Sequence, residues 1–423
     1  MYWIYSALLA ISLIVSLPYW LLQMARHGKY RAGLGERLGA VPERLKTRAC
    51  PTIWVHAVSV GEVLAVSRLI DELKCHFPSY RVVISTTTAT GQKLARTRFG
   101  DQNVFYFPLD FAFAIRPYLA VLRPNLVVVA ETEFWPNFLL LTHRSGTRIA
   151  IVNARISDRS WPGYRRFRPL LKRVLVHIDC FLAQTDEDRR RLMDIGAPAE
   201  RVEVSGNLKF DVPLPPAPAI VASLRTSFLQ AGAAPVLVCG STVEDEERFL
   251  LQAFENVLAS YPKAVMILAP RHPERFSEVT GLLEDLGVRF WRRSLWSGEP
   301  IVGGVLLIDT IGELASLYAL ADVAFVGGSL VPRGGHNIIE PAQHGVAIIV
   351  GNHTENFRDI VGLFQSRDAL RVVGPAEFPL TLMDLISKPE ERTALGRRAA
   401  ETLQSQTGAT ERTRAALEKL LQP

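Results

Sequence analysis

Short apolar runs alternate with amphipathic stretches along the chain beyond residue 50. Runs rich in β-branched residues predict first-half strands near residues 53–58, 82–87, 104–107, 126–130, 149–153, 181–184 and 202–205. Further runs predict second-half strands near residues 236–239, 265–269, 305–308, 323–326 and 348–350. Continuous apolar runs that are followed by helices are typical of parallel strands covered on both faces. We therefore expect an α/β protein with two doubly wound sheets.

A proline-rich segment separates the two halves and contains Pro213, Pro215, Pro216 and Pro218. Prolines at this density cannot lie inside a helix or a central strand, so we predict a linker at residues 211–222. The predicted domains are residues 26–210 and 223–423, and the helical pattern at residues 390–421 could return to the first domain. Ligands bind at the carboxyl ends of the strands in such sheets, so we expect a site in a cleft between the domains.

The first 25 residues contain no charged side chain, and residues 8–22 are almost continuously apolar. Aromatic residues lie at both ends of this stretch, where they favour a membrane interface. The segment that follows is rich in arginine and lysine, which predicts that the body lies on the cytoplasmic side. We predict a membrane anchor at residues 1–25, with Pro18 leaving open a spanning or a half-inserted helix. An ordinary buried helix is the alternative, although such helices usually have a polar face.

The composition narrows the class of protein only moderately. The chain of 423 residues is 48% hydrophobic and 21% charged, which is typical of a globular protein of two or three domains. Its net charge of +6 suits an anionic partner such as a membrane surface or a nucleotide. The four cysteines form no CxxC pair and lie in or beside apolar runs, so we predict reduced, buried thiols and no zinc site.

Acidic residues follow two of the first-half strands. Glu62 comes after the strand in WVHAVSVGE, at the start of a helix whose dipole would hold its carboxylate ionised. It is either a general base or a simple helix cap. Glu131 and Glu133 follow the strand in AETEFWPN, and we expect only one of them to face the cleft because residues two apart in an extended chain point oppositely.

Other polar residues of the first half have simpler interpretations. Asp186 and Asp188 have a spacing that would suit a metal, but they lie where a helix begins, so we interpret them as caps. His56 lies within an apolar strand and is interpreted as a core histidine. We infer no metal from either feature.

The second half contains a combination that is typical of phosphate binding. Arg271 and His272 follow a strand in LAPRHPE, where a guanidinium group could clamp phosphate oxygens. The segment FVGGSLVPRGGHNIIEP, 325–341, places a glycine-rich loop before a helix that we expect to begin near His336. Glu340 would accept hydrogen bonds from ribose hydroxyls. The alternative is a generic flexible loop.

A basic and aromatic segment, SDRSWPGYRRFRPLLKR, occupies residues 157–173. Its arginines, among them Arg159, Arg165 and Arg166, are interleaved with aromatic residues and suit an anionic lipid headgroup. Nucleic acid would also suit such a mixture, but the charge is modest and lies near the predicted anchor, so we expect no nucleic-acid partner.

These motifs closely resemble those of the bacterial Kdo transferases, which add 3-deoxy-D-manno-octulosonic acid (Kdo) to lipid A precursors. The matching stretches run through nearly the whole chain in the order HAVSVGE, ETEFWPN, NARISDRS, GNLKFD, APRHPERF, TIGEL, FVGGSLVPRGGHNIIEP and GNHTENF. The resemblance implies a GT-B fold, a membrane-proximal N-terminal segment, CMP-Kdo as donor and a lipid A precursor, lipid IVA, as acceptor. It places the enzyme at the cytoplasmic face of the inner membrane, in contact with membrane lipids.

The resemblance also implies roles for individual residues. Glu62 would be the general base and Glu131 would assist it, in an inverting single displacement that needs no metal and no cofactor. The residues implied to bind the CMP of the donor are Pro270, Arg271, Ile311, Gly312, Glu313, Asn337, Ile338, Ile339 and Glu340. Further contacts from the glycine loop are expected at Gly328, Ser329 and Gly335, and acceptor or membrane contacts at Arg159, Arg165 and Arg166.

Two other functions share some of these features. A nucleotide-sugar 2-epimerase has the same two-domain architecture, but such enzymes lack a charge-free N-terminal anchor. A non-catalytic membrane sensor of nucleotide sugars would tolerate the loss of Glu62, whereas a base-dependent transferase would lose most of its turnover.

Overall fold

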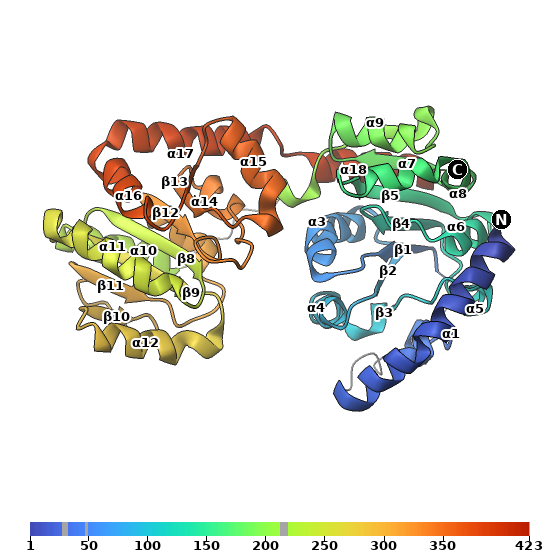
Figure 1. Cartoon of the computed structure of the whole chain (residues 1–423), viewed down its shortest axis with the longest axis horizontal. Helices are drawn as coiled ribbons and strands as arrows, with labels where there is room; N and C mark the ends of the chain where they lie inside the picture. The colour runs from blue at the N-terminus through green and yellow to red at the C-terminus, as the bar shows by residue number, and fades with distance from the viewer. Residues whose placement is uncertain (28–32, 47–49, 212–218, 423) are drawn as a thin grey trace. The chain divides into compact units, whose positions relative to one another are not determined.

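The protein forms two compact units in the computed structural model, which describes residues 1–27, 33–46, 50–211 and 219–422. The first unit contains residues 1–211 and 406–423, and the second contains residues 212–405. Each unit is built on its own parallel seven-stranded sheet (Figure 1). The prediction of an α/β protein with two parallel sheets is therefore confirmed.

The sheet of the first unit has the strand order β3-β2-β1-β4-β5-β6-β7. Its strands are β1 (Thr52–His56), β2 (Arg81–Thr86), β3 (Val104–Tyr106), β4 (Leu126–Ala130), β5 (Arg148–Ala154), β6 (Cys180–Ala183) and β7 (Val202–Val204). All seven lie where the apolar runs predicted them. Every residue of β1 and β4 is buried, as expected of central parallel strands covered on both faces.

Helices cover both faces of this sheet, with α3 and α4 on one side and α5 and α6 on the other (Figure 1). The helices of the first unit are α1 (Tyr2–His27), α2 (Leu34–Arg37), α3 (Val60–His76), α4 (Ala89–Phe99), α5 (Ala112–Leu122), α6 (Pro136–Arg144), α7 (Trp161–Arg166), α8 (Arg168–Leu175), α9 (Asp186–Asp194) and α18 (Ala409–Leu421). Alternate residues of β1 enter opposite cores, so Trp54 packs against Phe105 and Phe138 while Ile53 packs on the α3 side.

The last helix, α18, belongs to the first unit although it follows the second in sequence. Leu417 is buried in the same core as residues of α3. The carboxylate of Asp211 accepts hydrogen bonds from the backbone N–H groups of Gly408 and Thr410 at the start of the helix. The chain therefore returns to the unit in which it began.

The sheet of the second unit has the strand order β10-β11-β9-β8-β12-β13-β14. Its strands are β8 (Val236–Thr242), β9 (Val265–Pro270), β10 (Phe290–Arg292), β11 (Gly304–Leu307), β12 (Val323–Val326), β13 (Ala347–Gly351) and β14 (Arg371–Val373). The two edge strands, β10 and β14, were not predicted. Each has three residues that are mostly half-buried, so neither has the continuous apolar run that marks a central strand.

The second unit surrounds its sheet with helices in the same alternating order. They are α10 (Ala219–Ala231), α11 (Glu246–Ser260), α12 (Phe276–Asp285), α13 (Leu314–Leu317), α14 (Ile339–Gln343), α15 (Arg358–Ser366), α16 (Phe378–Ser387) and α17 (Pro389–Gln404). One core lies between α11, α16 and the sheet, and includes Phe254 and Phe325. A second core lies on the α10 side and includes Phe228 and Tyr318.

The N-terminal segment forms the helix α1, which continues through Pro18. Among the residues that the structure describes, no helix has both the length and the apolarity needed to cross a membrane. The alternative of an ordinary buried helix is wrong, because Trp3, Ile4, Leu8 and Val15 are all exposed.

Two predictions about local features need correction. Cys50 and Cys75 are exposed, whereas Cys180 and Cys239 are buried free thiols. Cys50 lies just before β1 and Cys75 in the last turn of α3, where neither sheet nor core covers them. The predicted linker falls largely on residues 212–218, outside the described residues, and its end is wrong because α10 begins at Ala219.

Candidate functional site

Glu62 lies in the first turn of α3, directly after the carboxyl end of β1. Its carboxylate accepts hydrogen bonds from the Val58 backbone N–H at 2.7 Å and from the Ser59 hydroxyl at 2.9 Å. The residue is 8% exposed, and burial raises the pKa of its carboxyl group. Glu62 is therefore both a local cap and a group with raised basicity, so the two interpretations do not exclude each other.

The acid loop, residues 131–135, follows β4 at the same edge of the sheet. Glu131 has a left-handed backbone with a φ of 56°, and its N–H donates to the Val152 carbonyl at 2.8 Å. The chain is therefore not extended here, so the alternation on which we based the prediction of a single site-facing acid does not apply. Glu131 and Glu133 both interact electrostatically with Glu62. The expected start of the next helix at Pro136 is confirmed.

One cation belongs to this acidic cluster, and the sequence reasoning did not single it out. The Lys209 ammonium lies 3.5 Å from the Glu131 carboxylate and lowers the pKa of Glu62. The turn that carries Lys209 is held by Asn153, whose side-chain oxygen accepts from the Leu208 N–H at 3.0 Å. The sequence did contain a signal for this lysine, because Lys209 follows β7 and the carboxyl ends of β7, β1 and β4 lie at the same edge of the parallel sheet.

Two carboxyl groups of this cluster, Glu62 and Glu133, have raised pKa values, with burial as the largest cause for each. Burial, followed by the charges of Glu62 and Glu131, raises the pKa of Glu133 to about 7. For Glu62 the opposing hydrogen bonds and Lys209 are outweighed by burial, so its pKa is also raised. Interacting carboxyl groups titrate as a set rather than one by one. Such a cluster can accept a proton from a weakly acidic group near neutral pH.

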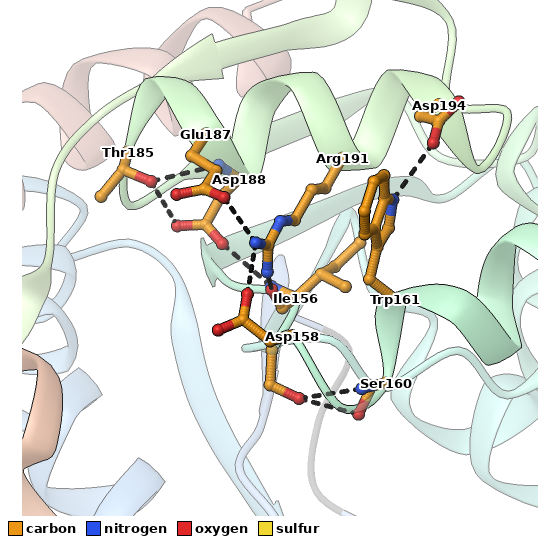
Figure 2. A network of polar contacts seen from close by, with 10 residues as sticks. Ile156, Asp158, Ser160, Trp161, Thr185, Glu187, Asp188, Arg191 and Asp194 are labelled. Carbon is orange, nitrogen blue, oxygen red and sulfur yellow. Dashed lines mark hydrogen bonds and ion pairs between the residues drawn. The ribbon is translucent and has the colours of Figure 1, made fainter.

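The segment that follows β5 is fastened to α9 by a network of polar contacts (Figure 2). The Arg191 guanidinium donates to the Ile156 carbonyl at 2.6 Å and also contacts Asp158 and Glu187. Asp188 accepts from the Ile156 N–H at 3.0 Å and from the Thr185 hydroxyl. The interpretation of Asp186 and Asp188 as the helix caps is wrong, because the cap of α9 is Thr185, whose hydroxyl accepts from the Asp188 N–H.

A shallow pocket of about 320 Å³ lies on α7 and is lined by Trp161, Pro162, Arg165 and Arg166. The indole N–H of Trp161 donates to Asp194 at 3.1 Å, as Figure 2 shows. The Arg165 guanidinium lies 5.6 Å from the centre of the Trp161 ring. The pocket thus joins a fixed aromatic surface to two cations. Arg159, which we expected beside them, does not line it.

In the second unit, the glycine loop after β12 is held by a buried carboxylate. Both oxygens of Glu246 accept hydrogen bonds, from the N–H groups of Gly328 (2.7 Å), Ser329 (2.9 Å) and Leu330 (2.9 Å). The Val243 N–H donates to it as well, and the residue is fully buried. The N–H groups of Gly328 and Ser329 are therefore already engaged. The Gly335 N–H donates to the Gly328 carbonyl. Any contact between this loop and a nucleotide sugar must therefore use other atoms.

Four of the residues predicted to hold the nucleotide, residues 337–340, follow this loop at the start of the next helix. Arg271 lowers the pKa values of both His336 and Glu340, although burial has the larger effect on each group. The helix here, α14, begins at Ile339 rather than near His336, because the Asn337 side chain accepts from the Ile339 N–H at 3.1 Å. Asn337 also donates to Glu340 at 3.3 Å. Ile338 and Ile339 are buried.

The remaining predicted donor residues lie in the turn after β11 and at the end of β9. Glu313 pairs with Arg293 at 2.9 Å and also accepts from Thr310, which fixes the turn. Gly312 has a φ of 90° and Ile311 is 79% exposed. Pro270 ends β9, and the N–H of the next residue donates to the Thr242 carbonyl at 2.9 Å.

Two buried acids, Glu246 and its neighbour Glu247, were missed by the sequence reasoning. Glu247 accepts from Arg275 at 2.6 Å and from the Thr242 hydroxyl at 2.9 Å, so it holds the segment APRHPERF. The acidic run after β8 was the available signal, because β8 lies between β9 and β12 in the sheet. In the described part of the chain, no group of three or more histidine, cysteine, aspartate or glutamate residues could hold a metal ion.

The chain is similar to proteins of one family along almost its whole length. The family described as 3-deoxy-D-manno-octulosonic-acid transferase (kdotransferase) matches residues 32–212. A 3-deoxy-D-manno-octulosonic acid transferase from Haemophilus influenzae is 34% identical over 415 residues, covering 96% of each chain. Another, from Bordetella pertussis, is 36% identical over 422 residues, covering 95% of each chain.

Among solved structures, a UDP-GlcNAc 2-epimerase from Neisseria meningitidis, bound to UDP-GlcNAc, covers 87% of this chain and 100% of its own. Its TM-score is 0.56 at 15% identity, so it shows the fold alone. The similarity to the two transferases is much stronger, because it covers at least 95% of this chain at more than twice the sequence identity of the epimerase. The chain therefore belongs to the 3-deoxy-D-manno-octulosonic acid transferase family and is a glycosyltransferase.

Proposed function

We propose that this protein transfers Kdo from CMP-Kdo to a lipid A precursor, lipid IVA, in an inverting displacement with Glu62 as general base. The observation that carries the proposal is the acidic cluster at the carboxyl edge of the first sheet. There a buried carboxylate with a raised pKa lies beside two further acids and one lysine. A base of this kind suits the deprotonation of a sugar hydroxyl, since a raised pKa strengthens the base.

In this mechanism Glu62 takes the proton of the acceptor hydroxyl as its oxygen forms a bond to the anomeric carbon of Kdo. The bond from that carbon to the CMP phosphate breaks in the same step, and CMP leaves with the electron pair. Glu131 assists by raising the pKa of Glu62, while Lys209 limits that effect. The charges that develop are balanced by side chains, so the proposal needs no metal ion.

The donor is proposed to bind at the second unit. Arg271 lies after the end of β9 within electrostatic reach of His336 and Glu340, which supports a role as the cation for the CMP phosphate. A guanidinium group stabilises the negative charge that develops on a leaving phosphate. Glu340 and Asn337 lie together, so that Glu340 can accept hydrogen bonds from the ribose and Asn337 can donate them. Ile311 offers an exposed apolar surface to the base or the sugar.

The acceptor and the membrane are proposed to meet the first unit at α1 and α7. The exposed apolar side chains of α1 suit the acyl region of a bilayer, and the arginines of α7 suit phosphate groups on a lipid. The pocket on α7 presents Arg165 and Arg166 beside an indole ring, which suits a phosphorylated amphiphile. We propose the cytoplasmic face of the inner membrane as the location.

The test uses the full-length protein in detergent with CMP-Kdo, lipid IVA and EDTA, followed by mass spectrometry of the lipid. We expect a mass gain of at least one Kdo and an anomeric configuration opposite to that in the donor. Glu62→Gln should lower kcat by about 10²–10⁴-fold, the usual effect of losing a general base. Glu72→Gln, a half-exposed site on the same helix, is the matched control and should leave kcat unchanged.

An unchanged lipid from folded protein would contradict the proposed reaction. Transfer that persists in Glu62→Gln would contradict the role of Glu62 as general base, but not the proposed reaction itself. Isomerisation of a nucleotide sugar without transfer would indicate the epimerase function instead.

A further inference from the structure

The helix α1 has two different faces. Trp3 and Ile4 point away from the protein and are 90% and 67% exposed. Tyr2, Tyr5 and Ser6 lie on the other face and contact the first unit. The Tyr2 hydroxyl donates to the Arg173 carbonyl at 3.0 Å and lies 2.9 Å from a ring nitrogen of His177. The first two turns of α1 are therefore docked onto the folded body, whatever the rest of the helix binds.

The docked face reaches the N-terminus of α6 through Asn137. The side-chain amide of Asn137 donates to the Ser6 hydroxyl at 2.9 Å and to the Asp110 carbonyl at 2.6 Å. The Asp110 carboxylate accepts from the N–H groups of Asn137 at 3.1 Å and Phe138 at 2.7 Å. Asp110 thus caps α6, and the Tyr5 hydroxyl interacts with the same carboxyl group.

The capping of α6 by Asp110 depends on every hydrogen bond that the carboxylate accepts, because Asp110 is almost fully buried. Burial raises its pKa to about 6, against the hydrogen bonds that lower it. A buried carboxylate depends on each of its donors, since no water replaces a donor that is lost. The contacts of α1 with Asp110 and Asn137 are therefore part of what holds the start of α6 in place.

The start of α6 is also the end of the acid loop. At one end, the loop is fastened to β5 by the N–H of Glu131 and to the Arg155 carbonyl by the Thr132 hydroxyl. At the other end it runs directly into Pro136, the first residue of α6. Glu133 lies between these two attachments. Its position relative to Glu62 is set by the strand on one side and by the capped helix on the other.

We propose that the first two turns of α1 position the catalytic acid loop, through the contacts of Tyr5 and Ser6 with the Asp110–Asn137 cap. The inference rests on the proposed role of the acidic cluster. Tyr5 and Ser6 touch no substrate in this scheme and are positioning residues. The N-terminal helix is then more than a tether, because the segment that binds lipid on one face supports the acids of the active site on the other.

The experiment measures turnover by the full-length protein in detergent, using CMP-Kdo and a deacylated, water-soluble lipid A precursor. This acceptor separates the effect on catalysis from any effect on membrane binding. Tyr5→Phe and Ser6→Ala should each lower kcat by about fivefold, the usual cost of one hydrogen bond to a buried group, with KM for CMP-Kdo unchanged. Ser6→Thr keeps the hydroxyl and should restore kcat.

Ser16→Ala is the matched control on the same helix. The Ser16 hydroxyl donates to the Ser12 carbonyl within α1 at 2.7 Å, so its loss should leave kcat on the soluble acceptor unchanged. If Ser16→Ala lowers kcat as much as Ser6→Ala, the effect comes from the helix in general and the proposal is overturned.

The pH profile gives a readout that a merely structural role would not move. Glu133 is faced by Glu62 and Glu131, with Lys209 paired to Glu131 and the Tyr164 hydroxyl nearby. A loosened acid loop moves Glu131 and Glu133 away from Glu62, so the repulsion that raises the pKa of the Glu62 base weakens and the acidic limb of kcat should shift to lower pH. An unshifted profile with unchanged kcat in Tyr5→Phe and Ser6→Ala overturns the inference. If Glu62→Gln is inactive in the same assay, the proposed function survives that failure.

Discussion

At the scale of single residues, burial outweighs the local effects that sequence position suggests. Glu62 lies in the first turn of a helix, where the dipole favours the ionised carboxylate. The structure buries the same carboxyl group beside Glu131, and burial has the largest effect on its pKa. The net shift is upward, which opposes the expectation from the helix alone. Burial, together with the charges of Glu62 and Glu131, also raises the pKa of Glu133 to about 7.

This shift predicts a pH dependence of stability that can be assigned to Glu133. The unfolded chain ionises near pH 4.5 and the folded protein near pH 7, so the stability contributed by this group is present below pH 4.5 and is lost as pH rises to 7. In Glu133→Gln the side chain cannot ionise, so this loss of stability between pH 4.5 and 7 does not occur. We expect its unfolding free energy to exceed that of the wild type by about 1–2 kcal/mol at pH 7.5, with the difference vanishing near pH 4.

Chemical denaturation at a series of pH values measures this difference. Glu200→Gln, at an exposed turn, is the control and should show no such trend. A constant difference between Glu133→Gln and the wild type from pH 4 to 7.5 would refute the assigned titration.

At the scale of elements, one helix start organises two loops of the second unit. The first turn of α11 carries Glu246, which holds the glycine loop, and Glu247, which holds Arg275 at the end of APRHPERF. A glycine-rich loop before a helix usually offers free N–H groups to a phosphate. Here a carboxylate of the protein occupies that position, so the loop is already ordered by an internal anion.

Replacing this carboxylate by an amide should disturb the donor side. In Glu246→Gln one oxygen becomes an NH₂ group that cannot accept, so two of the four N–H donors lose their acceptor. We expect a loss of about 1–3 kcal/mol in unfolding free energy and a raised KM for CMP-Kdo. Glu255→Gln, on the exposed face of the same helix, should change neither quantity. Unaltered stability and KM in Glu246→Gln would show that the loop does not depend on this anion.

At the scale of the whole molecule, the exposed apolar side chains gather unevenly. Among the side chains that the structure describes, seven of the large exposed apolar ones lie on α1: Trp3, Ile4, Leu8, Ile11, Ile14, Val15 and Leu17. Most exposed leucines and phenylalanines elsewhere are single, which is normal for a protein surface. A contiguous apolar face of this kind usually marks a partner, and a lipid surface is the partner proposed above.

This face predicts a membrane affinity that a single charge should reduce. Ile11→Asp removes an apolar side chain and places a carboxylate against anionic lipid, so binding to vesicles that contain anionic lipid should fall at least about tenfold. Leu229→Asp makes the same kind of change at an exposed site on α10 and should leave binding unchanged. Co-sedimentation with the vesicles measures both variants, and equal binding by Ile11→Asp and the wild type would contradict a role for α1.

Much of the fold could be predicted from the sequence, and less of the site. The central strands were predicted because each is a continuous apolar run, which in a parallel sheet reports burial on both faces. The edge strands β10 and β14 carry no such signal, since one side of each lacks a neighbour. Glu62, Glu131 and Arg271 were singled out because they follow strand ends. Lys209, Glu246 and Asn137 were not, because their roles depend on partners far along the chain.

The sequence by itself determined the class of the protein: two parallel α/β units, the acids and arginine at the strand ends, and the motifs of one transferase family. These follow from local pattern and composition, which need no knowledge of distant contacts. Only the tertiary structure decided that both acids of the loop interact electrostatically with Glu62 and that the chain makes a left-handed turn at Glu131. It also decided that Ser6 supports Asn137, 131 residues away. Burial and pairing arise between segments that folding alone brings together, and they determine the pKa of a carboxyl group and the position of a loop.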